Sequence, residues 1–239
     1  ATSVTLTAAD STWSVATADL ATALTAGVRF AGALTVTGIA NGNEAAALTD
    51  YTTAITGATT NTLTAADGTW SVAASTLTTA LADGVRLAGA LTVTDITDET
   101  AALTAFTATT TGATSVTLTA SDSTWSVTDS DLTTALADGV MFVGTLAVTN
   151  IASGNETAAL TAYTDTLTGA TSVTLTASDT NWSVAATTLD TALAAGVRLN
   201  GDLTITGIST EANASTTYSK TATGATNVTL VASDGTWSV

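Results

Sequence analysis

The sequence contains no cysteine, no histidine and no proline, and only four of its 239 residues are lysine or arginine. Without histidine and cysteine, the chain cannot build a histidine-based catalytic triad, a thiolate nucleophile, or the usual zinc and haem sites. The lack of cysteine also excludes a disulfide framework, so stability must come from packing and backbone pairing. We therefore expect no enzyme, and no catalytic, cofactor-binding or metal-ligating residues.

Positively charged residues are scarce, and this argues against a second group of functions. Twenty acidic residues against four basic ones give a formal net charge of −16, which phosphate backbones and anionic lipid headgroups would repel. The mean hydropathy is +0.40, yet no apolar run approaches the roughly 18 residues of a spanning helix. We expect neither nucleic-acid binding nor membrane insertion.

What the chain does have is an internal repeat. Tryptophan recurs at positions 13, 70, 125, 182 and 237, each time within a phrase such as ATSVTLTASDSTWSV. A second aromatic column is Tyr51, Phe106, Tyr163 and Tyr218. The repeats predicted from these columns are 1–57, 58–112, 113–169 and 170–224, with 225–239 starting a fifth. We read the chain as one continuous repeat array and as a window of a longer protein.

Each repeat divides into two halves that begin with a strand-like tetrad, so a strand returns every 25 to 30 residues. In VTLT and LTVT an apolar residue alternates with threonine, which is the period of a strand with one buried face. Val4, Leu6, Leu34 and Val36 would point inward. A turn centred on Asp10 and its equivalents would follow, and then a short Trp-Ser-Val strand.

A short helical phrase comes next. In residues 75–84, Leu77 and Leu81 share one face at a spacing of four. Ser75 or Thr76 would cap the start, and Gly84 would adopt the left-handed conformation past the end. The second half has a weaker counterpart at residues 44–48 and 156–160.

One such half-repeat cannot close a core alone, but stacked copies can. We therefore predict a mainly β fold, a parallel β-solenoid with coils of about 25–30 residues and short helical turns. Equivalent residues would form ladders of tryptophan, of tyrosine and phenylalanine, and of threonine. The alternative is a string of small β-sandwich domains, one per repeat, although that size is marginal for an independent core.

Phrases such as TTALADGVRLAGALTVTDI and GATSVTLTASDSTWSV resemble the Ala/Thr-rich β-strand repeats of bacterial surface proteins, including giant adhesins and S-layer-like secreted proteins. The resemblance covers the whole chain. It implies export to the cell surface, great length and a structural or adhesive role, and it supplies no catalytic residue.

Four recurring features are candidate sites. The aspartates at 10, 67, 122, 179 and 234 could bind calcium between coils, but each turn offers one carboxylate where calcium prefers six to eight oxygens, so a structural Asx turn is favoured. The arginines at 29, 86 and 198 could form a docking stripe for a neighbouring chain or be paired locally. The tryptophans could be sugar platforms, although burial in the core is favoured.

The threonine pairs are the fourth feature. Thr5 with Thr7, Thr35 with Thr37, and Thr117 with Thr119 resemble the ice-binding arrays of some β-solenoid antifreeze proteins, while threonine is also a common solvent-facing strand residue. The function we expect is structural: a stiff repetitive rod in an extracellular filament, sheath or surface layer, with copies of itself or neighbouring filament chains as partners. The alternative is the stalk of a giant adhesin, and ice binding is a remote alternative.

Overall fold

A computed structural model describes residues 3–237. The chain forms two compact units. The first runs to Ser121 and includes residues 137–140, and the second holds Asp122–Leu136 and continues from Met141. Each unit is described by itself.

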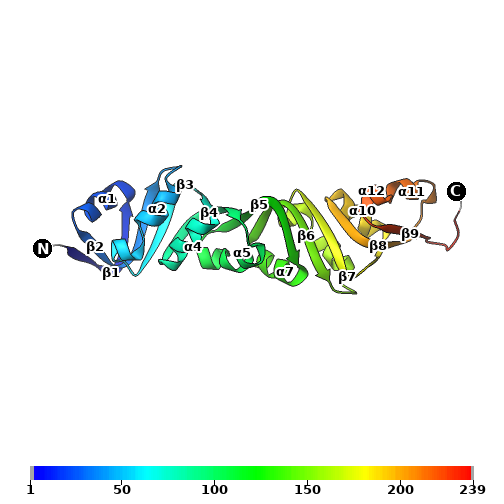
Figure 1. Cartoon of the computed structure of the whole chain (residues 1–239), viewed down its shortest axis with the longest axis horizontal. Coiled ribbons are helices and arrows are strands. Elements are labelled where there is room, and N and C mark those ends of the chain that lie inside the picture. The colour runs from blue at the N-terminus through cyan, green and yellow to red at the C-terminus, as the bar shows by residue number, and fades with distance from the viewer. Residues whose placement is uncertain (1–2, 238–239) are drawn as a thin grey trace. The chain divides into compact units, whose positions relative to one another are not determined.

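Strands and helices alternate along the sequence in both units, as the labels in Figure 1 show. The strands are β1 (Val4–Ala16), β2 (Val28–Ile39), β3 (Thr60–Ala73), β4 (Val85–Ile96), β5 (Ser115–Thr128), β6 (Val140–Ile151), β7 (Ser172–Ala185), β8 (Val197–Ile208) and β9 (Asn227–Ala232). The unit boundary falls within β5.

Helices of three lengths follow the strands. The nine-residue helices are α1 (Thr17–Thr25), α4 (Ala74–Ala82), α7 (Asp129–Ala137) and α10 (Ala186–Ala194). The seven-residue helices are α2 (Glu44–Asp50), α5 (Glu99–Ala105) and α8 (Glu156–Ala162), replaced in repeat 4 by the 3-10 turn η1 (Glu211–Asn213) and α11 (Ala214–Thr217). The four-residue helices are α3 (Thr53–Thr56), α6 (Ala108–Thr111), α9 (Asp165–Thr168) and α12 (Lys220–Thr223).

Within each unit the strands lie side by side in sequence order and are parallel. The mainly β fold of stacked parallel strands with short helices between them is thereby confirmed. β2 of repeat 1 pairs with β3 of repeat 2, placing Val36 opposite Leu63. Successive repeats therefore share a sheet, which the alternative of separate β-sandwich domains does not allow.

The predicted repeats end at recurring structural positions. Residues 57, 112, 169 and 224 are the glycines that follow the four-residue helices, each with φ between 77° and 82°. Just before each glycine lies a fully buried threonine, for example Thr111, whose hydroxyl donates to the Thr107 carbonyl at 2.8 Å and accepts the Ala113 N–H at 3.2 Å. These threonines satisfy backbone groups at the helix end, a role that the sequence pattern did not reveal.

The turn predicted in the first strand of each repeat does not separate two strands. It is a bulge within one continuous strand, at which the pairing with the next strand shifts register. β3 and β4 pair at Thr64 opposite Ala88 and resume at Thr69 opposite Ala90, so the loop around Asp67 bulges out of the sheet. The bulge passes close to Gly89, where a Cβ would lie 2.2 Å from the Gly68 carbonyl oxygen. No larger residue fits there, and Gly32, Gly144 and Gly201 make the same close approach in the other repeats.

The alternation of buried and outward side chains follows the prediction, with an exception at β1. Leu34 and Val36 are buried, as are Val116 and Leu118 of β5. Their counterparts Val4 and Leu6 are 51% and 38% exposed, because β1 pairs with β2 on one side and with no other described strand.

The helical phrase is confirmed, but the predicted cap is wrong. α4 begins at Ala74, directly after the extended Ala73, and no side chain caps it. Ser75 and Thr76 lie inside its first turn because β3 leads straight into the helix. Gly84 has φ of +80°, as expected for a left-handed residue past the helix end.

The ladder prediction is wrong for tryptophan. Trp70 lies opposite Leu91, and the other paired tryptophans face leucines in the same way. Each repeat contributes two strands, and only the first carries tryptophan, so tryptophan and leucine alternate from strand to strand.

Candidate functional site

Three of the five tryptophans are core residues, while Trp13 is half-buried and Trp237 is 41% exposed. Trp70, Trp125 and Trp182 are at most 2% exposed, and the Trp125 ring meets Phe142 edge to face at 5.0 Å. The indole N–H of Trp70 donates to the Ala88 carbonyl at 3.0 Å, next to Gly89 where the register breaks. The indole thus supplies a partner for a carbonyl beside the bulge, and its burial leaves no sugar platform at these three positions.

The aspartate column forms Asx turns, as predicted. The Asp67 carboxylate accepts the backbone N–H of Thr69 at 2.9 Å, and Asp10, Asp122, Asp179 and Asp234 make the same bond two residues on. This backbone bond lowers the pKa of Asp67, and likewise of Asp10, Asp122 and Asp234. Among residues 3–237, no cluster of three acidic side chains could hold a metal ion.

The arginine column is paired locally. Arg86 donates from Nη1 to the Val85 carbonyl at 2.7 Å and to the Leu81 carbonyl at 3.3 Å. Arg198 makes the equivalent bonds to Val197 and Leu193. Leu81 and Leu193 lie in the last turns of α4 and α10, and their carbonyls also accept the N–H groups of Gly84 and Gly196. The guanidinium thus adds a positively charged donor at the carboxyl end of the helix.

The threonine pairs lie on the outward face of the sheet, where most are partly exposed. Across the strands of the first unit, Ser14, Thr35, Thr62 and Arg86 follow one another in register. At this position of the sheet, threonine therefore occupies only two adjacent strands, with serine on one side and arginine on the other. Arg86 ends the run of threonines because it faces Thr62 directly, ahead of the register shift at the bulge.

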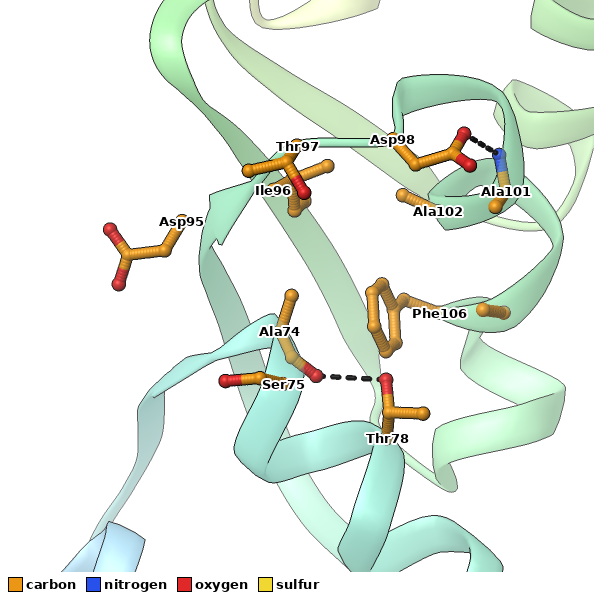
Figure 2. Close-up of a pocket in the computed structure, with 11 residues that line it drawn as sticks. Ala74, Ser75, Thr78, Asp95, Ile96, Thr97, Asp98, Ala101, Ala102 and Phe106 are labelled. Atoms are coloured by element: carbon orange, nitrogen blue, oxygen red, sulfur yellow. Dashed lines mark hydrogen bonds between the residues drawn. The ribbon is translucent and has the colours of Figure 1, made fainter.

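A groove opens at the carboxyl ends of β3 and β4 (Figure 2). It has a volume of about 340 Å³ and lies between the start of α4, the end of β4 and the helix α5. Its lining is largely apolar, with Ala74, Ile96, Ala102 and the Phe106 ring around the opening. The Asp98 carboxylate at the rim accepts the Ala101 N–H at 3.0 Å and caps α5.

The same groove recurs in repeat 4, with a volume of about 230 Å³. Each of its eleven lining residues lies 112 positions after its counterpart in repeat 2, so Ala74 corresponds to Ala186 and Phe106 to Tyr218. The groove is therefore a product of the repeat itself. Repeat 4 lines it with more polar groups, since Asp190 replaces Thr78 and Asn213 replaces Ala101.

The aromatic column places Phe106 in repeat 2 and tyrosine in repeats 3 and 4, where the hydroxyl adds hydrogen bonds. In repeat 3 the Tyr163 hydroxyl bonds the Asp129 carboxylate and, at 2.8 Å, the Thr133 hydroxyl. Burial and the bond to Asp129 raise the pKa of Tyr163 to about 12. Burial and a bond to Asp190 raise the pKa of Tyr218 to about 12 as well.

Comparison with known proteins gives no relative: no family model, no curated protein and no solved structure matches the chain. Among the described residues, no helix is long and apolar enough to cross a membrane. The fold thus defines the chain as a parallel-strand repeat protein, and arguments about its function depend on its own surfaces.

Proposed function

We propose that this chain is a structural subunit of an extracellular filament, sheath or surface layer, in which stacked repeats form a stiff rod. The main support is the pairing of strands across the repeat boundary, as between β2 and β3. Each repeat then stabilises its neighbour, and length can grow without a new core. Between residues 3 and 237, bulge, helix and glycine recur at regular spacing without an irregular insertion of the kind that usually carries a catalytic site.

The chain's partners in this role are copies of itself or neighbouring filament chains. A formal net charge of −16 makes such copies repel one another, so association should need salt or divalent cations to screen the charge. The alternative role, the stalk of a giant adhesin, needs the same stiffness and no contact between copies.

Sedimentation velocity of the purified chain separates the two roles. A filament subunit should form assemblies as ionic strength rises from about 10 mM to about 500 mM, because the Debye length falls over this range. Addition of millimolar calcium or magnesium should have the same effect, and chelation should reverse it. A chain that stays monomeric under all these conditions would favour the stalk.

A further inference from the structure

Two asparagines of the chain directly precede a glycine, and the structure holds them in different settings. Asn41 and Gly42 are the central residues of an exposed turn between β2 and α2, closed by the Asn43 N–H, which donates to the Ala40 carbonyl at 3.0 Å. Gly42 has φ of +86°, and a Cβ built on it would meet no atom within 4 Å. The space beside Gly42 is therefore open, and the peptide that joins it to Asn41 has room to rotate.

Two carboxylates bind the N–H groups of this pair, and all four residues lie in the first compact unit. The Glu44 carboxylate accepts the backbone N–H of Gly42 at 2.7 Å, and the Asp67 carboxylate accepts the side-chain amide N–H of Asn41 at 2.7 Å. A carboxylate at this distance can remove a proton as a general base. Glu44 therefore faces the backbone nitrogen that becomes the nucleophile when an asparagine-glycine peptide cyclises.

The second pair, Asn200 and Gly201, is held within β8. The Asn200 carbonyl accepts the indole N–H of Trp182 at 3.0 Å, and its side-chain amide donates to the Thr176 hydroxyl at 3.3 Å. A Cβ on Gly201 would lie 2.2 Å from the Thr180 carbonyl oxygen. The backbone here has no room to bring the glycine nitrogen onto the asparagine side chain.

We propose that Asn41 is a site of spontaneous covalent modification, at which the Gly42 nitrogen attacks Cγ of Asn41 with Glu44 as the base. The bond from the Gly42 nitrogen to Cγ forms and the bond from Cγ to Nδ2 breaks. Ammonia leaves with the proton that the Gly42 nitrogen loses. Water then opens the cyclic imide at either of its carbonyls, which gives an aspartyl or an isoaspartyl product. In sum, one water is consumed and one ammonia is released.

The modification changes the charge where the turn meets the next strand. The Asn41 amide donates to Asp67 in the bulge of β3. A carboxylate at position 41 has no N–H to donate and repels the Asp67 carboxylate. The reaction therefore adds a negative charge to the chain and releases the contact between this turn and β3. This inference does not depend on the proposed function.

Repeat 3 contains the same turn without the reactive amide. Ser153 takes the place of Asn41, Gly154 has φ of +92°, and its N–H donates to the Glu156 carboxylate at 2.7 Å. Glu156 makes the same backbone contact as Glu44 and is therefore its matched control.

The experiment incubates the purified chain at neutral pH in water enriched in oxygen-18 and follows each asparagine by peptide mass spectrometry. Conversion at Asn41 should be about tenfold or more faster than at Asn200, because only the exposed turn can bring the reacting atoms together. The product at Asn41 should carry the label and should contain both the aspartyl and the isoaspartyl form.

Two variants test the base. Glu44→Gln keeps an oxygen that can accept the Gly42 N–H but is a far weaker base, so it should slow conversion at Asn41 about tenfold. Glu156→Gln should leave that rate unchanged, and thermal unfolding of both variants should match that of the wild type.

Equal rates at Asn41 and Asn200 would overturn the inference, as would a Glu44→Gln variant that converts as fast as the wild type. Equal slowing by Glu156→Gln would overturn it too, because a general change in the fold would then explain the effect. Each of these results leaves the proposed function intact.

Discussion

Repeats 2 and 3 place an aromatic ring at the same position with different surroundings. In repeat 3 the Tyr163 hydroxyl reaches Asp129 and Thr133 of α7, which ties the end of α8 to the start of the preceding long helix. In repeat 2 the ring is Phe106, and the counterparts of Asp129 and Thr133 are Ala74 and Thr78. The Thr78 hydroxyl there donates to the Ala74 carbonyl of its own helix.

The comparison separates what the fold requires from what a single repeat can vary. Phe106 and Tyr163 are 4% and 5% exposed, so both rings are equally part of the core. The hydrogen bonds around Tyr163 are an addition that repeat 2 lacks. The groove does not depend on that addition, since repeat 4 has both a groove and a hydrogen bond between Tyr218 and Asp190.

Replacing either ring with alanine should have the largest effect on the free energy of unfolding. The loss should be similar in the two repeats, because both rings belong to the core. Phe106→Ala and Tyr163→Ala should each lower the free energy of unfolding by about 3–5 kcal/mol, because both leave a cavity in the core. Urea unfolding measures this. A loss under about 1 kcal/mol at either position would mean that the ring is not a shared requirement.

The next largest effect should appear at alkaline pH. The pKa of Tyr163 and of Tyr218 is about 12 in the folded chain, against about 10 in an unfolded one. The folded state therefore favours the protonated phenols, and their contribution to stability is complete below pH 10 and lost as pH rises towards 12.

Thermal unfolding measured between pH 9 and pH 12 should show this loss. The Tyr163→Phe/Tyr218→Phe variant should have a flatter profile over that range, since it has no phenol at either position to deprotonate. Identical slopes for the variant and the wild type would show that these two hydroxyls are not the groups responsible.

At neutral pH, Tyr163→Phe makes repeat 3 resemble repeat 2 and should cost about 1.5–3 kcal/mol, the contribution of a hydrogen bond to a charged group. The reverse exchange tests whether the hydrogen bond between tyrosine and aspartate can be built into repeat 2. Phe106→Tyr with Ala74→Asp should show a favourable coupling of about 0.5–1 kcal/mol beyond the two single variants. A coupling of zero in this double-mutant cycle would mean that the surrounding backbone, and not these side chains, forms the tie.

The smallest effect is expected at a buried position where repeat 2 differs from the others. Asn61 is fully buried and donates to the Tyr51 carbonyl at 2.5 Å, whereas Val116 and Val173 occupy its place in repeats 3 and 4. Asn61→Val should change stability by less than about 1 kcal/mol, because the lost hydrogen bonds are offset by apolar burial. A loss above about 2 kcal/mol in urea unfolding would show that repeat 2 depends on this amide.

Periodicity in the sequence predicted much of the fold and little of the groove. Alternation within VTLT at residues 116–119 places Leu118 inside and Thr119 outside, and this local pattern survives folding. The spacing of the tryptophans, twice that of the strands, already places tryptophan in every second strand. The residue that each tryptophan faces could not be predicted, because it depends on the register shift at the bulge around Asp67. The groove arises where β4 ends and where α4 and α5 begin, and no pattern in the sequence marks this meeting of elements.

The measurement that tests the central claim most directly is electron microscopy of the purified chain at high ionic strength, with averaging over any assemblies. The account predicts extended filaments or layers with a repeat near 4.8 Å along the stacking direction of the strands. Separate particles of single-chain size, with no ordered assembly at any ionic strength, would contradict it.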